Sequence, residues 1–220
     1  MRWHLKSHPN PKTKAHLAEV LQVPPVVAHL LAQRGIETFE GAKDYFRPYW
    51  GQLHDPFLMK DMDRAVDRLN KALSEDENIM VFGDYDVDGT TAVSLITHYL
   101  STLSAHAIPY IPDRYQEGYG LSKDGIDKAI REGIKLLICL DCGIKANELV
   151  NYAQTHRVDV IICDHHTPGE KLPKAYAVLD PKRSDCSYPF EELCGCGVAF
   201  KLVQAHVLHS GKDPESIRPY

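Results

Sequence analysis

The sequence predicts an α/β fold in which a parallel sheet carries helices on both faces, preceded by a helical N-terminal arm. From about residue 76 onward, apolar runs of strand length alternate with patterns of helical length, as in a parallel sheet with helical crossovers. Residues 1–75 show helical patterns without strand-like runs. We therefore expect a helical arm or cap at residues 1–75 and an α/β domain at residues 76–220.

The N-terminal arm shows several local helix signals. Pro25 suits the first turn of a helix, where a missing N–H costs no hydrogen bond, and Gly35 can end that helix. Thr38 can cap a third helix that stops before Pro48. The arm carries no recognisable chemical motif. The segments expected to be helical are 14–22, 25–34, 39–46 and 62–73.

The second part of the chain alternates between the two element types. Its strand-like runs are short and apolar, and they are rich in Val, Ile and Leu, as expected for strands covered on both faces. Gly133 is placed to end one of the intervening helices. The expected strands are 79–82, 107–111, 135–140, 158–163 and 175–179, and the expected helices are 90–103, 123–131, 145–156 and 198–208.

The composition limits the classes of protein that fit. Hydrophobic residues make up 44% of the 220 residues, so a packed core is expected and wholesale disorder is not. The net charge of −5 does not suit a protein held on nucleic acid by its own charge. No apolar run approaches the ~20 residues needed to span a bilayer, and the N-terminus lacks a signal-peptide pattern. We expect a soluble, cytoplasmic protein without membrane partners, its six cysteines mostly buried thiols.

Acidic and histidine residues follow three of the expected strands. In an open parallel sheet, ligands bind beyond the carboxyl ends of the strands, so these side chains should meet at one edge. The residues are Asp84, Asp86 and Asp88 after the first strand, Asp141 after the third, and Asp164, His165 and His166 after the fourth.

A cluster of five carboxylates requires positive charge. Without a cation some of the carboxyls would take up protons, and carboxylates with an imidazole suit Mn²⁺ or Mg²⁺. Asp86 and Asp88 are two residues apart, so an extended backbone would point them the same way. Gly89 then allows a sharp turn into a helix at Thr90, whose N-terminus favours an anion.

Each motif has a simpler interpretation when taken alone. The Asp-x-Asp-x-Asp-Gly run could be a calcium loop, but the twelfth position from Asp84 is Leu95 where an EF-hand needs glutamate. Asp141 could cap the following helix, and His165 with His166 could be a surface pair. Their coincidence at successive strand ends favours a shared site.

Two further motifs remain ambiguous. Cys139 and Cys142, together with the Cys194-Gly195-Cys196 run, could hold zinc, although zinc sites prefer wider spacing in each half. We expect instead that Gly195 and Gly197 let backbone N–H groups approach a phosphate at the start of the last helix. The alternative is a tight helix entrance without a ligand.

Together these motifs resemble the DHH phosphoesterase superfamily and, within it, the RecJ-like exonucleases specific for single strands. The likeness runs along nearly the whole chain, including the N-terminal arm. The stretches that carry it are 82–89, 112–121, 140–143, 164–166 and 195–202, with 30–36 and 53–56 in the arm.

The resemblance implies metal-dependent phosphodiester hydrolysis from the 5′ end of single-stranded DNA, in DNA repair and recombination. It implies Mn²⁺ or Mg²⁺ as cofactor, and a single-strand-binding protein or a helicase as a partner. Arg114 would clamp a phosphate, unless it is simply an exposed loop residue. By position, the ligands would be Asp86, Asp88, Asp141 and His165, with His166 on the scissile phosphate and Asp84 and Asp164 as ligands or orienting groups.

The sequence departs from the family pattern in two places. Some members have a histidine where this chain has Phe82, which leaves one of two metal sites short of a ligand. The chain also ends at Tyr220, before a strand that supplies a further aspartate in the family. We therefore expect a fragment that binds metal weakly and has little nuclease activity alone. Two other functions stay open: a phosphodiesterase of short oligonucleotides or cyclic dinucleotides, and a catalytically silent scaffold.

Overall fold

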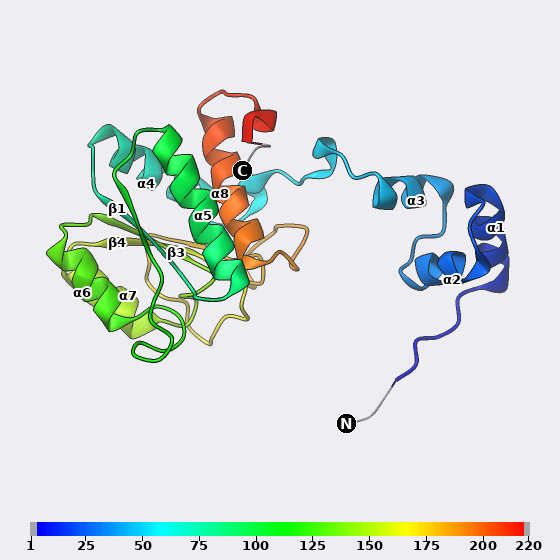
Figure 1. Ribbon diagram of the computed structural model, residues 1–220, viewed down its shortest axis with the longest axis horizontal. Helices are drawn as coiled ribbons and strands as arrows, with labels where there is room; N and C mark the ends of the chain where they lie inside the picture. Colours follow the sequence, from blue (N-terminus) through cyan, green and yellow to red (C-terminus); the bar gives the residue numbers. More distant parts are fainter. Residues whose placement is uncertain (1–3, 218–220) are drawn as a thin grey trace. The chain divides into compact units, whose positions relative to one another are not determined.

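The computed structural model describes residues 4–217 and divides the chain into two compact units, Met1–Leu53 and His54–Tyr220. The first unit contains three helices around a small core of Leu17, Ala28, Leu31, Ala32 and Ala42 (Figure 1). Its elements are α1 (Pro11–Leu21), α2 (Pro25–Gln33), α3 (Phe39–Phe46) and the 3₁₀ turn η1 (Trp50–Gln52).

The division falls after Leu53 and not near residue 75, because the fourth helix of the expected arm packs on the sheet-containing unit. This helix, α4 (Met62–Ser74), follows the 3₁₀ turn η2 (Pro56–Leu58) and contacts both β5 and α8. Arg68 of α4 is buried, and its Nε lies 2.6 Å from Asp159 Oδ2 at the start of β4. The helix therefore belongs to the α/β unit.

Five parallel strands form one sheet in the order β2-β1-β3-β4-β5, which confirms the predicted fold class. Helices α6 and α7 cover one face, and α5 and α8 pack together on the other (Figure 1). The strands are β1 (Ile79–Gly83), β2 (Ala107–Tyr110), β3 (Leu136–Leu140), β4 (Asp159–Cys163) and β5 (Ala177–Leu179). The helices are α5 (Val87–Thr102), α6 (Lys123–Arg131), α7 (Asn147–Thr155) and α8 (Gly195–His209), followed by the 3₁₀ turn η3 (Pro214–Ile217).

Burial on both faces explains the continuous apolar character of the strands. Alternate residues of β1, Met80 and Phe82, pack into the core beneath α6 and α7, together with Leu137 and Cys139 of β3. The intervening residues, such as Val81, are also fully buried. Over the part of the chain that the structure describes, no helix is long and apolar enough to cross a membrane.

Two helices begin three residues earlier than the sequence suggested, and both starts lie at the carboxyl edge of the sheet. Asp86 caps α5, since its Oδ1 accepts a hydrogen bond of 3.0 Å from the Gly89 N–H. Asp88 therefore lies in the first helical turn, and the expectation of an extended Asp86-to-Asp88 segment was wrong. Helix α8 begins at Gly195, so both glycines of that motif lie in its first turn.

Candidate metal centre

Three aspartates continue the sheet by one residue beyond the carboxyl ends of β1, β3 and β4. The N–H of Asp84 donates to the Leu140 carbonyl, that of Asp141 to the Cys163 carbonyl, and that of Asp164 to the Leu179 carbonyl. All three side chains are buried, at 0%, 1% and 1% exposure respectively. The sheet thus fixes three carboxyl groups side by side, as the strand-end pattern predicted.

The candidate ligands form two groups that share Asp141. In each group the donor atoms lie within 4.8 Å of one another. Asp141 Oδ1 lies 3.1 Å from His165 Nε2, which is also 3.6 Å from Asp88 Oδ2. The two groups are Asp84, Asp86 and Asp141, and Asp141, His165 and His166.

The carboxyl groups of the cluster lie close together without enough nearby positive charge to balance them. Burial raises the pKa of Asp141 to about 8, and the nearby charges of Asp88 and Asp86 add to the effect. Burial also raises the pKa of Asp84. Asp141 Oδ1 and Asp84 Oδ2 are buried without a hydrogen bond among the described residues. Uncompensated buried oxygens beside an imidazole fit a bound Mn²⁺ or Mg²⁺.

Phe82 lies outside the candidate ligand groups, whereas Asp84 belongs to one of them. The Phe82 ring is fully buried, stacks on Tyr110 with centroids 5.2 Å apart, and packs against α6 at Gly125. Asp84 instead places a carboxylate in the first ligand group. That group therefore has three carboxylates without any contribution from position 82.

Asp88 joins the N-terminus of α8 to the cluster. Its two oxygens accept hydrogen bonds of 2.7 Å from the N–H groups of Gly195 and Cys196. A Cβ at position 195 would lie 2.5 Å from Asp141 Oδ1, so glycine allows the helix to approach the cluster this closely. The Gly195 N–H is thus already used, and the Gly197 N–H donates to Cys194 Sγ at 3.4 Å. The Gly195 N–H therefore contacts a carboxylate of the cluster and the Gly197 N–H a thiol, and the phosphate contact expected of these glycines stays a prediction.

Asp164 orients the second histidine of the pair. Its Oδ1 accepts from the N–H groups of His165 and His166 and lies 2.7 Å from His166 Nδ1, while Oδ2 accepts from the Ile144 N–H. Burial opposes a charge on the His166 ring, but the bond to Asp164 and the charges of Asp164 and Asp141 together outweigh burial, so the pKa of His166 is raised. The sequence had assigned such an orienting role to Asp164 without indicating which histidine it holds.

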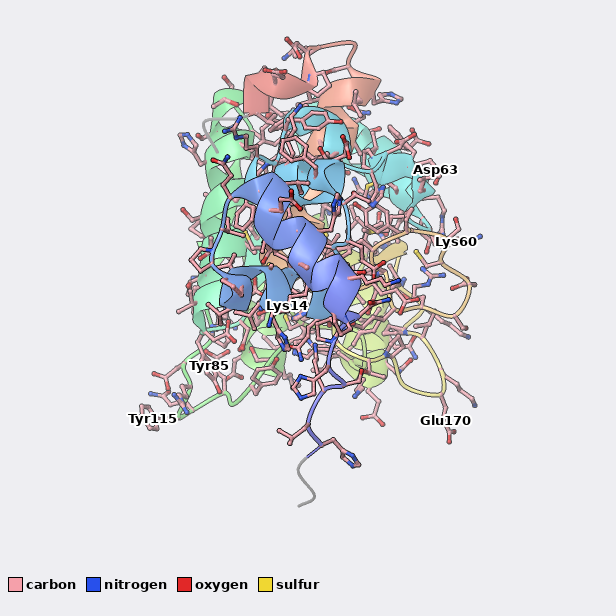
Figure 2. The ribbon with its side chains drawn as sticks, turned by 90° about the vertical axis from the view of Figure 1, so that its right-hand side faces the viewer. Lys14, Lys60, Asp63, Tyr85, Tyr115 and Glu170 are labelled. Carbon is pink, nitrogen blue, oxygen red and sulfur yellow. The ribbon has the colours of Figure 1, made fainter. Side chains whose placement is uncertain are left out.

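A loop between β2 and α6 adds residues that the sequence reading missed or left ambiguous. Tyr119 Oη lies 3.1 Å from His166 Nε2, a contact that local patterns could not indicate. Arg114 lies over the Tyr85 ring, 5.2 Å from its centroid, and forms no ion pair with the described residues. Tyr115 protrudes from this loop and is exposed (Figure 2).

Asp180 is a fourth strand-end carboxyl that the sequence analysis missed. It directly follows β5 and is fully buried, and burial raises its pKa to about 6. Its Oδ1 accepts from the Lys182 N–H, whereas Oδ2 has no hydrogen-bond partner among the described residues. The rule that identified the other strand-end aspartates also points to this residue, because the expected strand 175–179 ends directly before Asp180.

Two of the simpler interpretations do not fit the structure. Asp141 does not cap α7, because the cap position is Ala146 and Asp141 points into the cluster. Cys139 and Cys142 are buried, and over residues 4–217 the groups able to hold a metal contain no cysteine.

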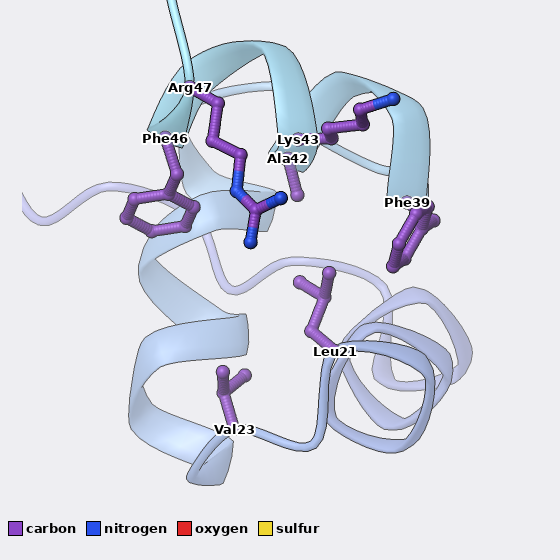
Figure 3. A pocket seen from close by; sticks show the side chains of 7 residues that line it. All are labelled: Leu21, Val23, Phe39, Ala42, Lys43, Phe46 and Arg47. Atoms are coloured by element: carbon purple, nitrogen blue, oxygen red, sulfur yellow. The ribbon is translucent and has the colours of Figure 1, made fainter.

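A separate pocket of about 410 Å³ lies in the N-terminal unit. Phe39 and Phe46 flank it, Leu21 and Val23 lie at its floor, and Arg47 extends over it (Figure 3). Its lining contains no carboxylate or imidazole, so it is not part of the metal centre.

Comparison with known proteins identifies the family of the chain. The model of the DHH family, N-terminal domain, matches residues 78–219. The chain is 44% identical over 205 residues to the single-stranded-DNA-specific exonuclease RecJ of Bacillus subtilis, covering 93% of this chain and 26% of that protein. It is 36% identical to RecJ of Escherichia coli, covering 84% of this chain and 31% of that protein.

Solved structures give the same family. RecJ of Thermus thermophilus in complex with Mn²⁺ matches with a TM-score of 0.75 and 28% identity, over 97% of this chain and 30% of that chain. An exonuclease RecJ bound to manganese matches with a TM-score of 0.65 and 34% identity, over 71% of this chain and 40% of that chain. The chain spans about a quarter to a third of the length of these curated relatives. By the family match and by the arrangement of its strand-end carboxylates and histidines, the chain belongs to the DHH family.

Proposed function

We propose that this chain carries the metal-dependent phosphodiesterase site of a 5′-to-3′ exonuclease acting on single-stranded DNA in repair and recombination. The observation that carries the proposal is Asp141, a buried carboxyl shared by two groups of metal-ligand type. The relatives of the chain include curated single-stranded-DNA-specific exonucleases, which supports this substrate class. A single-strand-binding protein or a helicase is the partner class we expect.

The ligands we propose are four carboxylates and one imidazole. A bound Mn²⁺ or Mg²⁺ would polarise the phosphate and lower the pKa of the attacking water. Asp141 would serve both halves of the site, because its donor atom lies within reach of both groups. The proposed ligands are Asp84, Asp86, Asp88, Asp141 and His165.

Asp88 has a second task in this proposal. Both of its oxygens accept hydrogen bonds from N–H groups of α8. These bonds hold the carboxylate beside His165. Gly195 contributes to the site through that fixed carboxylate. A ligand held by two backbone donors is pre-positioned, which lowers the entropy lost when a cation binds.

His166 is the residue that we propose to contact the scissile phosphate. Asp164 accepts the Nδ1 proton of its ring, which leaves Nε2 facing Tyr119 and the open side of the cluster. In this orientation a protonated ring donates to a phosphate oxygen through Nε2 once the Tyr119 hydroxyl is displaced. The guanidinium of Arg114, which lies over the Tyr85 ring and forms no ion pair with the described residues, supplies a further phosphate contact from the loop.

Calorimetry with Mn²⁺, followed by single-turnover hydrolysis of a 5′-labelled single strand, tests the proposal. We expect Mn²⁺ binding that is lost in Asp141→Asn and kept in Asp44→Asn, an exposed carboxylate of the N-terminal unit. We expect slow release of nucleotides from the 5′ end of a single strand, and none from a blunt duplex. Faster cleavage of dinucleotides than of long strands would favour the short-oligonucleotide function, and absence of Mn²⁺ binding would favour a silent scaffold.

A further inference from the structure

A pocket of about 300 Å³ lies directly beside the ligand cluster, between the loops that follow β2 and β3. His166 lies on its rim, so a group bound in the pocket would lie next to a phosphate held by that histidine. The walls are mainly apolar and come from Leu121, Cys142, Ile144 and Ala146. A pocket of this size, at the lower end of the range for small-molecule sites, suits a single nucleoside better than a dinucleotide.

Tyr119 forms the aromatic wall of this pocket. Its side chain is partly open to solvent, and its hydroxyl oxygen lies 3.1 Å from His166 Nε2. Gly118 and Gly120 flank it with φ of +83° and +79°, a conformation that other residues rarely adopt. The backbone on both sides of Tyr119 is therefore specialised to present this ring beside His166.

Glu117 anchors the segment that carries Tyr119. One of its oxygens accepts a 2.8 Å hydrogen bond from the Asp113 N–H, and the other accepts from the Tyr110 hydroxyl and the Ser122 hydroxyl. These bonds tie the loop to the end of β2 and to the N-cap of α6. The backbone segment that carries Tyr119 is thus held in place by the fold.

From these contacts, and resting on the function proposed above, we propose that the pocket receives the nucleobase of the nucleotide whose phosphate lies at His166. Tyr119 is its stacking wall. Aromatic side chains stack on any of the bases, which suits a pocket with apolar walls. Lys145 lies exposed at the rim and supplies positive charge beside the phosphate.

Calorimetric titration in MgCl₂ with thymidine 5′-monophosphate and with 2-deoxyribose 5-phosphate separates the base from the phosphate. We expect the nucleotide to bind more tightly than the sugar phosphate. Relative to Tyr119→Phe, Tyr119→Ala should weaken nucleotide binding about 5-fold to 150-fold, the range for loss of one base–aromatic stack, whereas the two variants should bind the sugar phosphate equally. Tyr119→Phe keeps the ring and should keep the preference for the nucleotide.

The outcomes separate failure of the pocket from failure of the site. Equal affinities for the two ligands in the wild-type chain would overturn the base pocket and leave the phosphate site intact. Equal losses in Tyr119→Ala and Tyr119→Phe would overturn stacking, because the hydroxyl would then carry the effect. Failure of both ligands to bind would overturn the proposed phosphate site together with the pocket. Far-ultraviolet circular dichroism confirms that each variant is folded.

Discussion

Replacing Gly195 with alanine should destabilise the chain far more than the same change at Gly197. A Cβ at 195 would lie 2.5 Å from Asp141 Oδ1 and 2.6 Å from Asp141 Cβ, both parts of a buried residue that cannot move away. The helix start must shift instead, which strains its two bonds to Asp88. Overpacking costs about 1–3 kcal/mol and a weakened hydrogen bond to a charged group about 1.5–3 kcal/mol. We expect a total loss of about 2.5–6 kcal/mol in the free energy of unfolding.

Gly197→Ala is the matched control, two residues along the same first turn. Its Cβ would lie 3.3 Å from the Leu193 side chain, which can adjust, and alanine favours a helix over glycine by about 1 kcal/mol. Urea unfolding followed by circular dichroism gives both free energies of unfolding. If the two variants differ by less than about 0.5 kcal/mol, the size of an ordinary surface effect, the close approach of α8 to Asp141 is not as described.

Three more changes test other parts of the structure. Burial lowers the pKa of His206 from its ordinary value to about 4, so only the unfolded chain takes up this proton between about pH 6.5 and pH 4. The free energy of unfolding should therefore fall by about 3 kcal/mol as the pH falls through this range. Urea titrations at each pH measure this change. His206→Gln should remove it, whereas replacement of the exposed His209 should not. Asp164→Asn should lower the free energy of unfolding by about 2–3 kcal/mol, because a buried acceptor of several N–H bonds is exchanged for a group that also donates. An unchanged urea midpoint would contradict this. Mn²⁺ at 100 times its dissociation constant should raise the free energy of unfolding by about 2.7 kcal/mol, and equal stabilisation of Asp141→Asn would show that the ion binds elsewhere.

The sequence predicted the features that local patterns determine. Helices over 39–46 and 123–131 have the predicted bounds, because Thr38 and Ser122 provide capping side chains at their starts. The convergence of Asp84, Asp141 and Asp164 followed from the rule that parallel strands end at one edge.

The remaining features depend on contacts between distant segments. Asp88 lies more than a hundred residues before Gly195, so no local pattern could indicate that its carboxylate accepts hydrogen bonds from the N–H groups of α8. The start of α5 was misplaced because Asp86, which looked like a metal ligand alone, also caps the helix. The contact of Tyr119 with His166 spans two loops and has no local signal.

The proposed function depends most directly on a cation at Asp141. Diffraction from crystals soaked in MnCl₂, recorded on both sides of the manganese absorption edge, locates the ion independently of any activity. We expect an anomalous peak within ligand distance of Asp141 and His165, and its absence in crystals of Asp141→Asn. A peak elsewhere, or none in the wild-type chain at saturating Mn²⁺, would contradict the assignment of this strand-end cluster as a metal centre.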